Sequence, residues 1–311
     1  MRDDAARAPA VRIDGRAVCV TACSLCGAAD AATVFARHDF RYQRCLDCGL
    51  VRVSPQLTQE AIADIYRDGY ASKSRSAAPV DAPIAANEKD VLDALTRYAG
   101  FPGYLLDVGC FEGRFLHAAA RTGWRATGTE ISPAAVSRAR ERFGLDVRLG
   151  TLDEVAFPDG CFDAVVLFDV VEHLPDPRRT MDEVRRILRP GGVVYLWTPN
   201  FNCLTRRVAR ARWGAVVFPW HLYYFDARTL RRLVAETGFA PVRLGSRNWL
   251  LDFRDPYAAL NAGRGLSRPP RLVRRARRML DIASEPFFAW ADRHGRHWGA
   301  QIELYARKVT R

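Results

Sequence analysis

An open α/β sheet of mainly parallel strands, with helices between them, is the fold class that this sequence predicts. The first observation is the segment LLDVGCFEGRFL (105–116), in which an apolar run, a glycine turn and the start of a helix follow one another. The second is Glu130, which ends the next apolar run twenty-one residues after Gly109. A strand, turn, helix, strand and acid in this order form a nucleoside-binding crevice at the carboxyl edge of a sheet.

Each part of this segment has a physical role. Residues 105–108 suit a buried strand, and a helix is expected from Phe115 onward. Gly109 and Gly113 let the backbone turn sharply and let a ligand approach without meeting a side chain. The helix opens with free amides and a positive dipole end toward the crevice. The carboxylate of Glu130 is placed to accept hydrogen bonds from both hydroxyls of a ribose.

The charge of the ligand follows from Asp107, which stands two residues ahead of Gly109. The dinucleotide motif G-x-G-x-x-G has no acid at this point and serves a pyrophosphate. A carboxylate here would repel a pyrophosphate but suits an ammonium or a sulfonium. The sequence therefore favours a nucleoside ligand with a cationic end.

Further elements are expected along the chain. The strands are predicted over 145–150, 162–168, 193–200 and 299–308, a helix over 177–188, and turns at Thr151-Leu152, Asp159-Gly160 and 189–192. Residues 169–173 follow the strand 162–168 and should therefore lie at its carboxyl end, facing the ligand.

The spacing D-x-G-x-x-x-G (Asp107, Gly109, Gly113) resembles the first motif of class I S-adenosylmethionine-dependent methyltransferases. The segment 157–177, FPDGCFDAVVLFDVVEHLPDP, is similar to the fourth-strand region of that family. The resemblance covers about 88–245 and again 299–308. It implies a Rossmann-like sheet with S-adenosylmethionine as cofactor. One departure is Phe111, where the family often has glycine, and it bears on the local shape of the loop.

The same resemblance implies which residues bind the cofactor. They are Asp107, Gly109, Cys110, Phe111, Gly113, Glu130, Ile131, Thr151, Leu152 and Asp169. In the family, the turn at Thr151 and Leu152 borders the adenine. Glu172 is expected to shape the cofactor site together with Asp169.

A metal site is predicted near the start of the chain. Cys23-x-x-Cys26 and Cys45-x-x-Cys48 are separated by eighteen residues, a spacing typical of four-cysteine zinc sites. A glycine follows each pair and permits a tight knuckle. Disulfides are the alternative, which a reducing compartment disfavours. Four sulfur ligands leave no open position, so Zn²⁺ here would be structural.

The expected organisation is a zinc ribbon over 19–56, a helix and flexible linker or lid over 57–87, and a methyltransferase domain over 88–311. The ribbon resembles the N-terminal segment of a methyltransferase subgroup from bacterial surface-glycan and natural-product gene sets. In that subgroup, tyrosines such as Tyr66 and Tyr70 close over the cofactor; here they could equally pack a helix over 58–67. A basic helical insertion is expected at about 249–297.

Composition bears on the compartment. The chain has 311 residues and is 49% hydrophobic, which is ample for a core. It contains no apolar run of about 18 residues that could span a membrane. Residues 1–10 lack the apolar stretch of a secretory signal. We therefore expect a cytoplasmic protein, with peripheral attachment at the inner membrane face as a further option.

Positive charge is concentrated in residues 201–311, which hold 22 Lys and Arg against 8 Asp and Glu. Much of it lies in 204–213 and 268–283. As a helix, the second stretch gathers apolar residues on one face, namely Leu272, Val273, Ala276, Met279, Leu280 and Ala283. Such a helix could lie on an anionic membrane, meet nucleic acid or a substrate diphosphate, or simply pack on its own sheet.

Methyl transfer to a hydroxyl requires an aligned acceptor and a base, for which histidine is suited near neutral pH. His221, within FPWHLYYFDARTL (218–230), is the first candidate because its segment borders the acceptor side in this fold, where Trp220, Tyr223, Tyr224 and Phe225 could form a wall. His173 is the second candidate. Structural hydrogen bonds would explain both histidines equally well.

Two functions are compared. The first is a methyltransferase of a small molecule, sugar or lipid-linked glycan, with O-methylation favoured. The second is an RNA methyltransferase that binds nucleic acid through the ribbon and the basic C-terminal region. The ribbon is not strongly basic, and FDVVEH (168–173) replaces the base-methylating N/D-P-P-Y type of motif. The sequence therefore favours the first function and leaves the acceptor unidentified.

Overall fold

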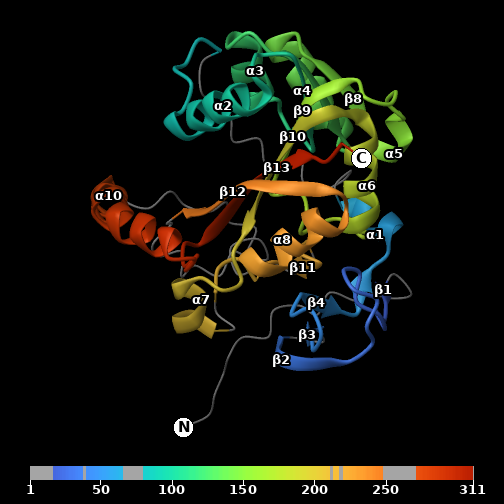
Figure 1. Cartoon of the computed structure of the whole chain (residues 1–311), viewed down its shortest axis with the longest axis vertical. Helices are drawn as coiled ribbons and strands as arrows, with labels where there is room; N and C mark the ends of the chain where they lie inside the picture. Colours follow the sequence, from blue (N-terminus) through green and yellow to red (C-terminus); the bar gives the residue numbers. More distant parts are fainter. Residues whose placement is uncertain are drawn as a thin grey trace. The chain divides into compact units, whose positions relative to one another are not determined.

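The computed structural model of the chain describes residues 17–37, 40–65, 80–210, 213–216, 220–247 and 271–310 (Figure 1). Tyr66, Tyr70 and residues 248–270 lie outside them. The chain forms two compact units, each described here by itself. The sheet unit comprises Gln59–Thr198, Arg228–Leu244 and Glu303–Arg311, and the ribbon unit comprises Met1–Thr58, Pro199–Ala227 and Gly245–Ile302.

A seven-stranded sheet has the order β12-β13-β10-β9-β6-β7-β8. Its strands are β6 (Tyr104–Val108), β7 (Arg125–Glu130), β8 (Asp146–Leu149), β9 (Phe162–Phe168), β10 (Leu188–Pro199), β12 (Phe239–Arg247) and β13 (Gln301–Lys308). From β10 to β8 all neighbouring strands are parallel. The chain runs from β6 outward to β8 and then returns to β9 on the other side of β6. The switch point between β6 and β9 is where α/β sheets bind ligands.

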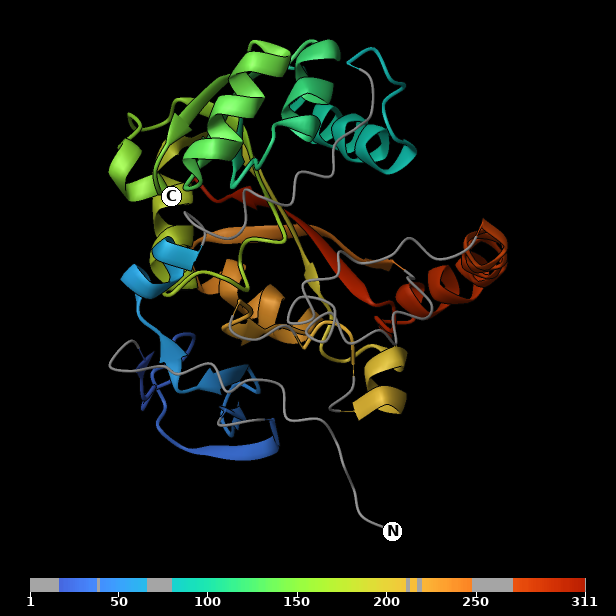
Figure 2. The same cartoon turned by 180° about the vertical axis from the view of Figure 1, so that it is seen from behind.

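Helices cover both faces of this sheet (Figures 1 and 2). They are α1 (Gln59–Ile65), α2 (Ala86–Ala99), α3 (Arg114–Arg121), α4 (Pro133–Phe143), α5 (Leu152–Val155), α6 (Pro177–Ile187) and α8 (Ala227–Glu236). Apolar residues of α2, α3 and α4 share a core with alternate strand residues, including Leu105, Ala164 and Val166. Because side chains alternate across a strand, Leu106 and Val165 turn to the opposite face. The strands are therefore buried on both sides, as parallel sheets require.

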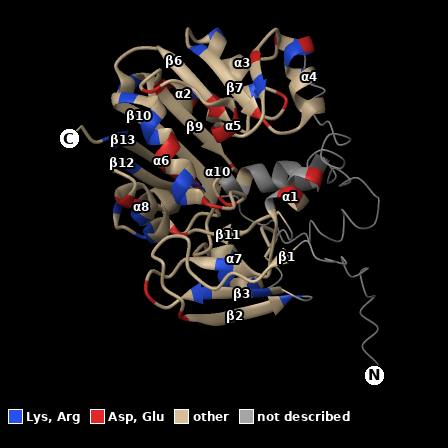
Figure 3. Ribbon diagram, turned by 90° about the vertical axis from the view of Figure 1, so that its right-hand side faces the viewer, with Lys and Arg blue, Asp and Glu red and all other residues tan. Residues whose placement is uncertain are grey.

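The helix α6 packs its apolar stripe inward and pairs its polar side with α8. Met181, Val184 and Ile187 are fully buried. On the outer side, Arg178 of α6 donates to Glu236 of α8 at 2.9 Å, and Arg232 donates to the same carboxylate at 2.6 Å. Residues of both charge signs occur along these two helices (Figure 3). These exposed pairs contribute little stability each, so the apolar stripe holds the helix in place.

Two expected turns differ in the structure. Thr151 caps the one-turn helix α5, accepting from the amide of Glu154, so Leu152 is helical. Residues 189–192, predicted as a turn, lie inside β10 as an irregularity. There the pairing with β9 jumps from Leu188 to Val193. Pro190 has no amide to donate and Gly191 has φ +75°, so a turn-like sequence is accommodated as a bulge.

The ribbon unit is built on short antiparallel strands. These are β1 (Ala17–Val18), β2 (Ala31–Arg37), β3 (Phe40–Cys45), β4 (Val51–Ser54), β5 (Gln56–Leu57) and β11 (Tyr223–Tyr224). One sheet has the order β11-β4-β3-β2, so a segment from late in the chain completes the ribbon. Its aromatic core joins Phe40 and Tyr42 to Phe201, Trp213 and Tyr224. The unit also contains α7 (Leu204–Ala209) and α10 (Arg271–Arg293).

Membrane-spanning segments were sought in the described part of the chain. No helix there combines the length and the apolar character needed to cross a bilayer.

Candidate cofactor site and cysteine cluster

Three strand ends in the sheet unit bring the predicted cofactor residues together. Asp107 and Gly109 lie at the end of β6, Glu130 ends β7, and Asp169 follows β9. Asp107 pairs with Gly128 on β7 and with Val166 on β9, so it lies at the centre of this edge. The strand order thus places these residues at the switch point between β6 and β9.

The loop between β6 and α3 depends on backbone conformations that glycine adopts readily. Gly109 has φ +70°, and a β-carbon there would come within 2.8 Å of Val170. Gly113 has φ +75° and forms the N-cap of α3. Phe111 also has a positive φ, +50°, although it is not glycine. Glycine adopts this left-handed conformation without strain, whereas Phe111 adopts it at a cost.

Glu130 ties this loop to the start of α4. One carboxylate oxygen accepts from the amide of Phe111 at 2.9 Å, and the other accepts from the amide of Ser132 at 2.9 Å. A carboxylate has about four lone-pair sites. The amide of Ile131 also interacts with this carboxylate, so three backbone donors leave about one acceptor position for a ribose hydroxyl.

The other loop amides already have partners. Those of Gly109 and Cys110 both donate to the carbonyl of Thr129, at 2.8 and 3.0 Å, and that of Gly113 donates to the carbonyl of Cys110. A pyrophosphate cradle needs such amides free to point at the ligand. The loop amides at 109, 110, 111 and 113 are therefore not arranged for a phosphate, in agreement with the preference expected from Asp107.

Buried negative charge gives the site its electrostatic character. Burial, and then the charge of Glu130, raise the pKa of Asp107 well above its usual range. Burial also raises the pKa of Glu130, although amides of Ser132, Phe111 and Ile131 oppose the shift. A cation beside these two acids would stabilise their ionised forms and lower both pKa values. The site is therefore suited to a positively charged ligand.

A second acidic pair follows β9. Asp169 adopts φ +50°, and although the residue is exposed, protein atoms surround its carboxyl group. This desolvation raises the pKa of Asp169 to about 7. Burial, and then the charge of Asp169, raise the pKa of Glu172 well above its usual range. These surroundings therefore favour the neutral form of Glu172.

The remaining predicted residues lie around this edge. Ile131 is partly buried beside Glu130, Thr151 and Leu152 follow β8, and Cys110 is buried in the loop. Burial raises the pKa of Cys110, so its thiol is an inert apolar group.

Two further residues were not singled out from the sequence. Ser132 is fully buried, donates its amide to Glu130 and caps α4 through a hydroxyl that accepts from Ala135. The signal was available, since Ser-Pro before an apolar stretch predicts a helix start. Glu112 is buried and pairs with Arg138 of α4 at 2.7 Å. Nothing local in the sequence predicts this contact, which depends on the packing of α4 against the loop.

The two candidate bases belong to different units. His173 is in the loop after β9, where its amide donates to the carbonyl of Val170 at 2.9 Å. His221 is in the ribbon unit just before β11, and its ring lies 5.8 Å from that of Tyr224. Tyr224 belongs to the aromatic core of that unit, and Phe225 is fully buried.

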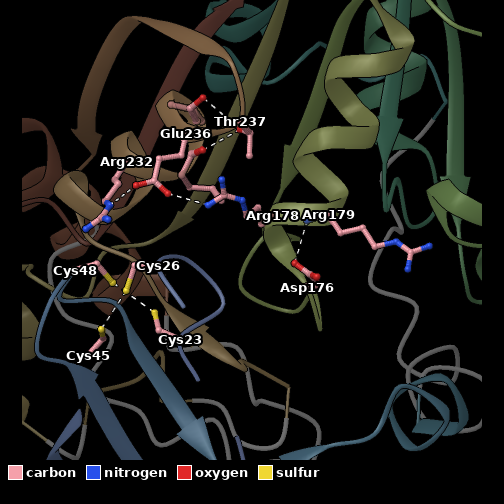
Figure 4. A network of polar contacts seen from close by, with 12 residues as sticks. Cys23, Cys26, Cys45, Cys48, Asp176, Arg178, Arg179, Arg232, Glu236 and Thr237 are labelled. Carbon is pink, nitrogen blue, oxygen red and sulfur yellow. Dashed lines mark hydrogen bonds and ion pairs between the residues drawn. The ribbon is translucent and has the colours of Figure 1, made fainter. Parts of the chain in front are cut away.

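The four cysteines of the ribbon unit converge on one point (Figure 4). Their sulfur atoms all lie within 4.8 Å of one another, with 3.5 Å between Cys23 and Cys48 and between Cys26 and Cys45. Tetrahedral zinc with Zn–S bonds of about 2.3 Å holds its sulfur atoms roughly 3.8 Å apart. The cluster therefore has the donor set and nearly the spacing of a four-sulfur metal site.

Two similar knuckles position these sulfur atoms. The amide of Gly27 donates to the carbonyl of Cys23 at 2.8 Å, and that of Gly49 donates to the carbonyl of Cys45 at 3.0 Å. The amide of Leu50 also donates to the sulfur of Cys48 at 3.4 Å. Burial alone would raise the pKa of Cys45, but amides of Cys48 and Asp47 and the thiol of Cys26 lower it to about 7. A thiolate, the form that binds metal, is thus favoured at Cys45.

The other cysteines stand apart from this cluster. Cys19 is exposed, Cys161 is partly buried and Cys203 is buried, and none of the described cysteines forms a disulfide. Burial raises the pKa of Cys161 and of Cys203. None of the three belongs to a group of potential metal ligands in the described part of the chain.

The fold and the proposed cofactor site together define the class of protein. A parallel sheet with Asp107 and Glu130 at the carboxyl ends of β6 and β7 fits S-adenosylmethionine-dependent methyltransferases. A family model described as a methyltransferase domain matches residues 84–244, more than half of the chain. The chain therefore belongs to the methyltransferase-domain family, whose cofactor is S-adenosylmethionine.

Individual similarities agree with this assignment. A probable S-adenosylmethionine-dependent methyltransferase of Mycolicibacterium smegmatis is 35% identical over 136 residues, 43% of this chain and 51% of that protein. A ubiquinone biosynthesis O-methyltransferase of Xanthomonas campestris is 30% identical over 157 residues, 47% of this chain and 66% of that protein. These matches therefore span about half to two thirds of the relatives' length.

One solved structure shows the fold alone. The [4+2]-cyclase SpnF aligns with a TM-score of 0.50 and 21% identity, covering 73% of this chain and 82% of that one. The Rossmann-like methyltransferase architecture is thereby supported, whereas the reaction must be argued from the site.

Replacing Glu130 by Gln tests the link between the loop and α4. The amide group of Gln would face one of two backbone donors and leave it unpaired, at a cost of about 1–3 kcal/mol. We expect the affinity for S-adenosylmethionine, measured by titration calorimetry, to fall about 10- to 100-fold. Glu141→Gln, on the exposed side of α4, should bind as the unaltered protein does. Equal affinities in both variants would refute the ribose assignment.

The raised pKa of Asp169 predicts a pH dependence. Near pH 7 the carboxyl is partly protonated, and it must lose its proton for its charge to meet a cationic ligand. The affinity for S-adenosylmethionine should therefore increase from pH 6 to pH 8, by up to about tenfold. This slope should shrink in Asp169→Asn and persist in the exposed control Asp182→Asn. The same slope in Asp169→Asn would exclude Asp169 from the site.

Proposed function

We propose that the chain transfers a methyl group from S-adenosylmethionine to a hydroxyl of a small molecule, sugar or lipid-linked glycan. The observation that carries the proposal is the pair of hydrogen bonds that the Glu130 carboxylate accepts from the amides of Phe111 and Ser132. The buried Asp107 lies at the same sheet edge. Glu130 can accept a hydrogen bond from a ribose, and the ionised carboxylates can balance the charge of a sulfonium. Membership of the methyltransferase-domain family supports the same reaction.

Oxygen as the methyl acceptor is supported by relatives. The Xanthomonas ubiquinone biosynthesis protein is an O-methyltransferase by name. Transfer to oxygen requires removal of the hydroxyl proton, and histidine is the side chain best matched to that step near neutral pH. We assign this role to His221, with His173 as the second candidate. Trp220 and Tyr223 flank His221 in sequence and are proposed to contact the acceptor.

The ten cofactor-binding residues expected from the resemblance remain our assignment. S-adenosylmethionine supplies the methyl group and its positive charge when bound. The chain supplies the acids Asp107, Glu130 and Asp169 around that charge, and the loop from Gly109 to Gly113 gives the nucleoside its space. Positioning of the acceptor in line with the methyl–sulfur bond would then account for much of the rate.

We also propose that the ribbon unit binds one structural Zn²⁺ through Cys23, Cys26, Cys45 and Cys48. The converging sulfur atoms support it. The described cysteines are free thiols, which is the state found in a reducing compartment. We therefore propose a cytoplasmic location. Zinc ribbon, linker and methyltransferase domain are accordingly our proposed organisation of the chain, with boundaries at about 19–56, 57–87 and 88–311.

Labelling of a cell extract tests the reaction. Methyl-labelled S-adenosylmethionine and the protein are incubated with host extract, which is then separated into RNA, lipid, glycan and small-molecule fractions. We expect label in a lipid, glycan or small-molecule fraction, carried by an O-methyl product, and much less label with Glu130→Gln at limiting cofactor. Label confined to RNA would support the alternative function as an RNA methyltransferase and overturn this proposal.

Loss of one cysteine tests the metal site. In Cys45→Ser the zinc content should fall from about one ion per chain to near zero, because three sulfur ligands do not close the site. The unfolding transition of the ribbon unit should move to lower temperature, while affinity for S-adenosylmethionine is retained. Cys203→Ser, a buried cysteine outside the cluster, serves as control. Equal zinc content in both variants would refute the site.

A further inference from the structure

One side of α10 anchors this helix within the ribbon unit. Phe288 and Ala291 are buried. The carboxylate of Asp292 accepts from the amide of Ser246 at 2.6 Å and from its hydroxyl at 2.7 Å, and it contacts a ring nitrogen of His297 at 2.9 Å. The second half of the helix is therefore fixed through one face, and the opposite face can be identified.

That opposite face is apolar and exposed. Met279 is 72% exposed, Phe287 44% and Trp290 43%, and Ala283 between them is also exposed. The separations of four, four and three residues place these side chains on one side of a helix. In the sequence, Ala276 and Leu272 continue the same spacing, three and seven residues before Met279. Of the alternatives for this helix, packing of its apolar face on its own sheet is therefore contradicted at Met279.

Aromatic rings close the stripe at its C-terminal end. The rings of Phe287 and Trp290 stack with centroids 6.3 Å apart, and Phe287 also stacks on Trp298 at 5.9 Å. Arg296 lies over the ring of Trp298 at 5.4 Å. Tryptophan with neighbouring arginine is typical of surfaces that meet the boundary between water and lipid, since the ring is apolar and its edge is polar.

The charge on this helix has one sign at its N-terminal end. Arginine occupies five of the first eight positions of α10, 271, 274, 275, 277 and 278, and no acid occurs among them. A soluble partner would need matching acidic groups opposite an apolar stripe. An anionic bilayer offers both together, because its headgroups carry negative charge above an apolar interior.

We propose that α10 is an interfacial helix, which lies in the headgroup region of an anionic phospholipid membrane through the stripe from Met279 to Trp290. The arginines contribute attraction that salt screens, and the exposed Met279, Phe287 and Trp290 contribute apolar burial. Two copies of the helix packed in parallel would bring their arginines together, which disfavours that form of self-association. Nucleic acid would leave the apolar stripe in water. The inference does not depend on the proposed methyl transfer.

Vesicle binding tests the proposal with the whole chain. Sedimentation is compared between vesicles of phosphatidylcholine alone and vesicles containing 30% phosphatidylglycerol. We expect binding to the anionic vesicles at least tenfold tighter than to the neutral ones, and weaker binding as salt is raised. Equal binding to both, or no binding to the anionic vesicles, would overturn the proposal without any variant.

A double variant distinguishes vesicle binding through the apolar stripe from binding through the positive charge of the chain alone. Met279→Glu with Trp290→Glu should bind anionic vesicles at least tenfold more weakly and keep the unfolding temperature of the ribbon unit, which confirms that this unit is folded. Val242→Glu changes a similarly exposed apolar residue on β12 and should bind as the unaltered protein does. Unchanged binding in the double variant would contradict the proposal. A dimer in sedimentation velocity that the double variant loses would instead assign the stripe to a second copy.

Discussion

The carboxylate of Glu130 holds the end of β7, the glycine loop after β6 and the start of α4 in one arrangement. It does so with two backbone hydrogen bonds, from Phe111 and from Ser132. Because the group is buried, removing either bond would leave a polar group without a partner in a region of low dielectric. The positive φ of Phe111 persists because this bond and the glycines on either side fix the loop. The shape of the proposed cofactor site therefore depends on a side chain that is also proposed to contact the ligand.

The cost of this arrangement is electrostatic. Asp107 and Glu130 are both buried, and each has its pKa raised. Asp169 and Glu172 repeat the pattern after β9. In the unliganded protein these surroundings favour the neutral forms of the four acids, and a bound cation would favour their ionised forms. S-adenosylmethionine carries a sulfonium and an ammonium, whereas its demethylated product lacks the sulfonium. This difference in charge would weaken the binding of the product relative to the cofactor.

Local sequence patterns predict much of the fold and of the proposed site. The strand, glycine loop and acid from residue 105 to Glu130 could be predicted because each element has its own periodicity or turn chemistry. The cysteine cluster could be predicted because its spacing reports ligands directly. The bulge at 189–192 could not, since Pro-Gly-Gly predicts a turn and only pairing with β9 shows a strand. The contact of Glu112 with Arg138 and the joining of β11 to β4 likewise depend on tertiary packing, which short-range patterns do not contain.

Hydrogen exchange can show whether Glu130 joins the loop after β6 to the start of α4 around a bound nucleoside. Peptides covering residues 108–116 and 129–134 are followed by mass spectrometry with and without S-adenosylhomocysteine. If the loop and the start of α4 are joined through Glu130 and close on a nucleoside, both peptides should gain protection together, and peptides from the ribbon sheet should not change. Binding of the nucleoside without protection in either peptide would contradict the account.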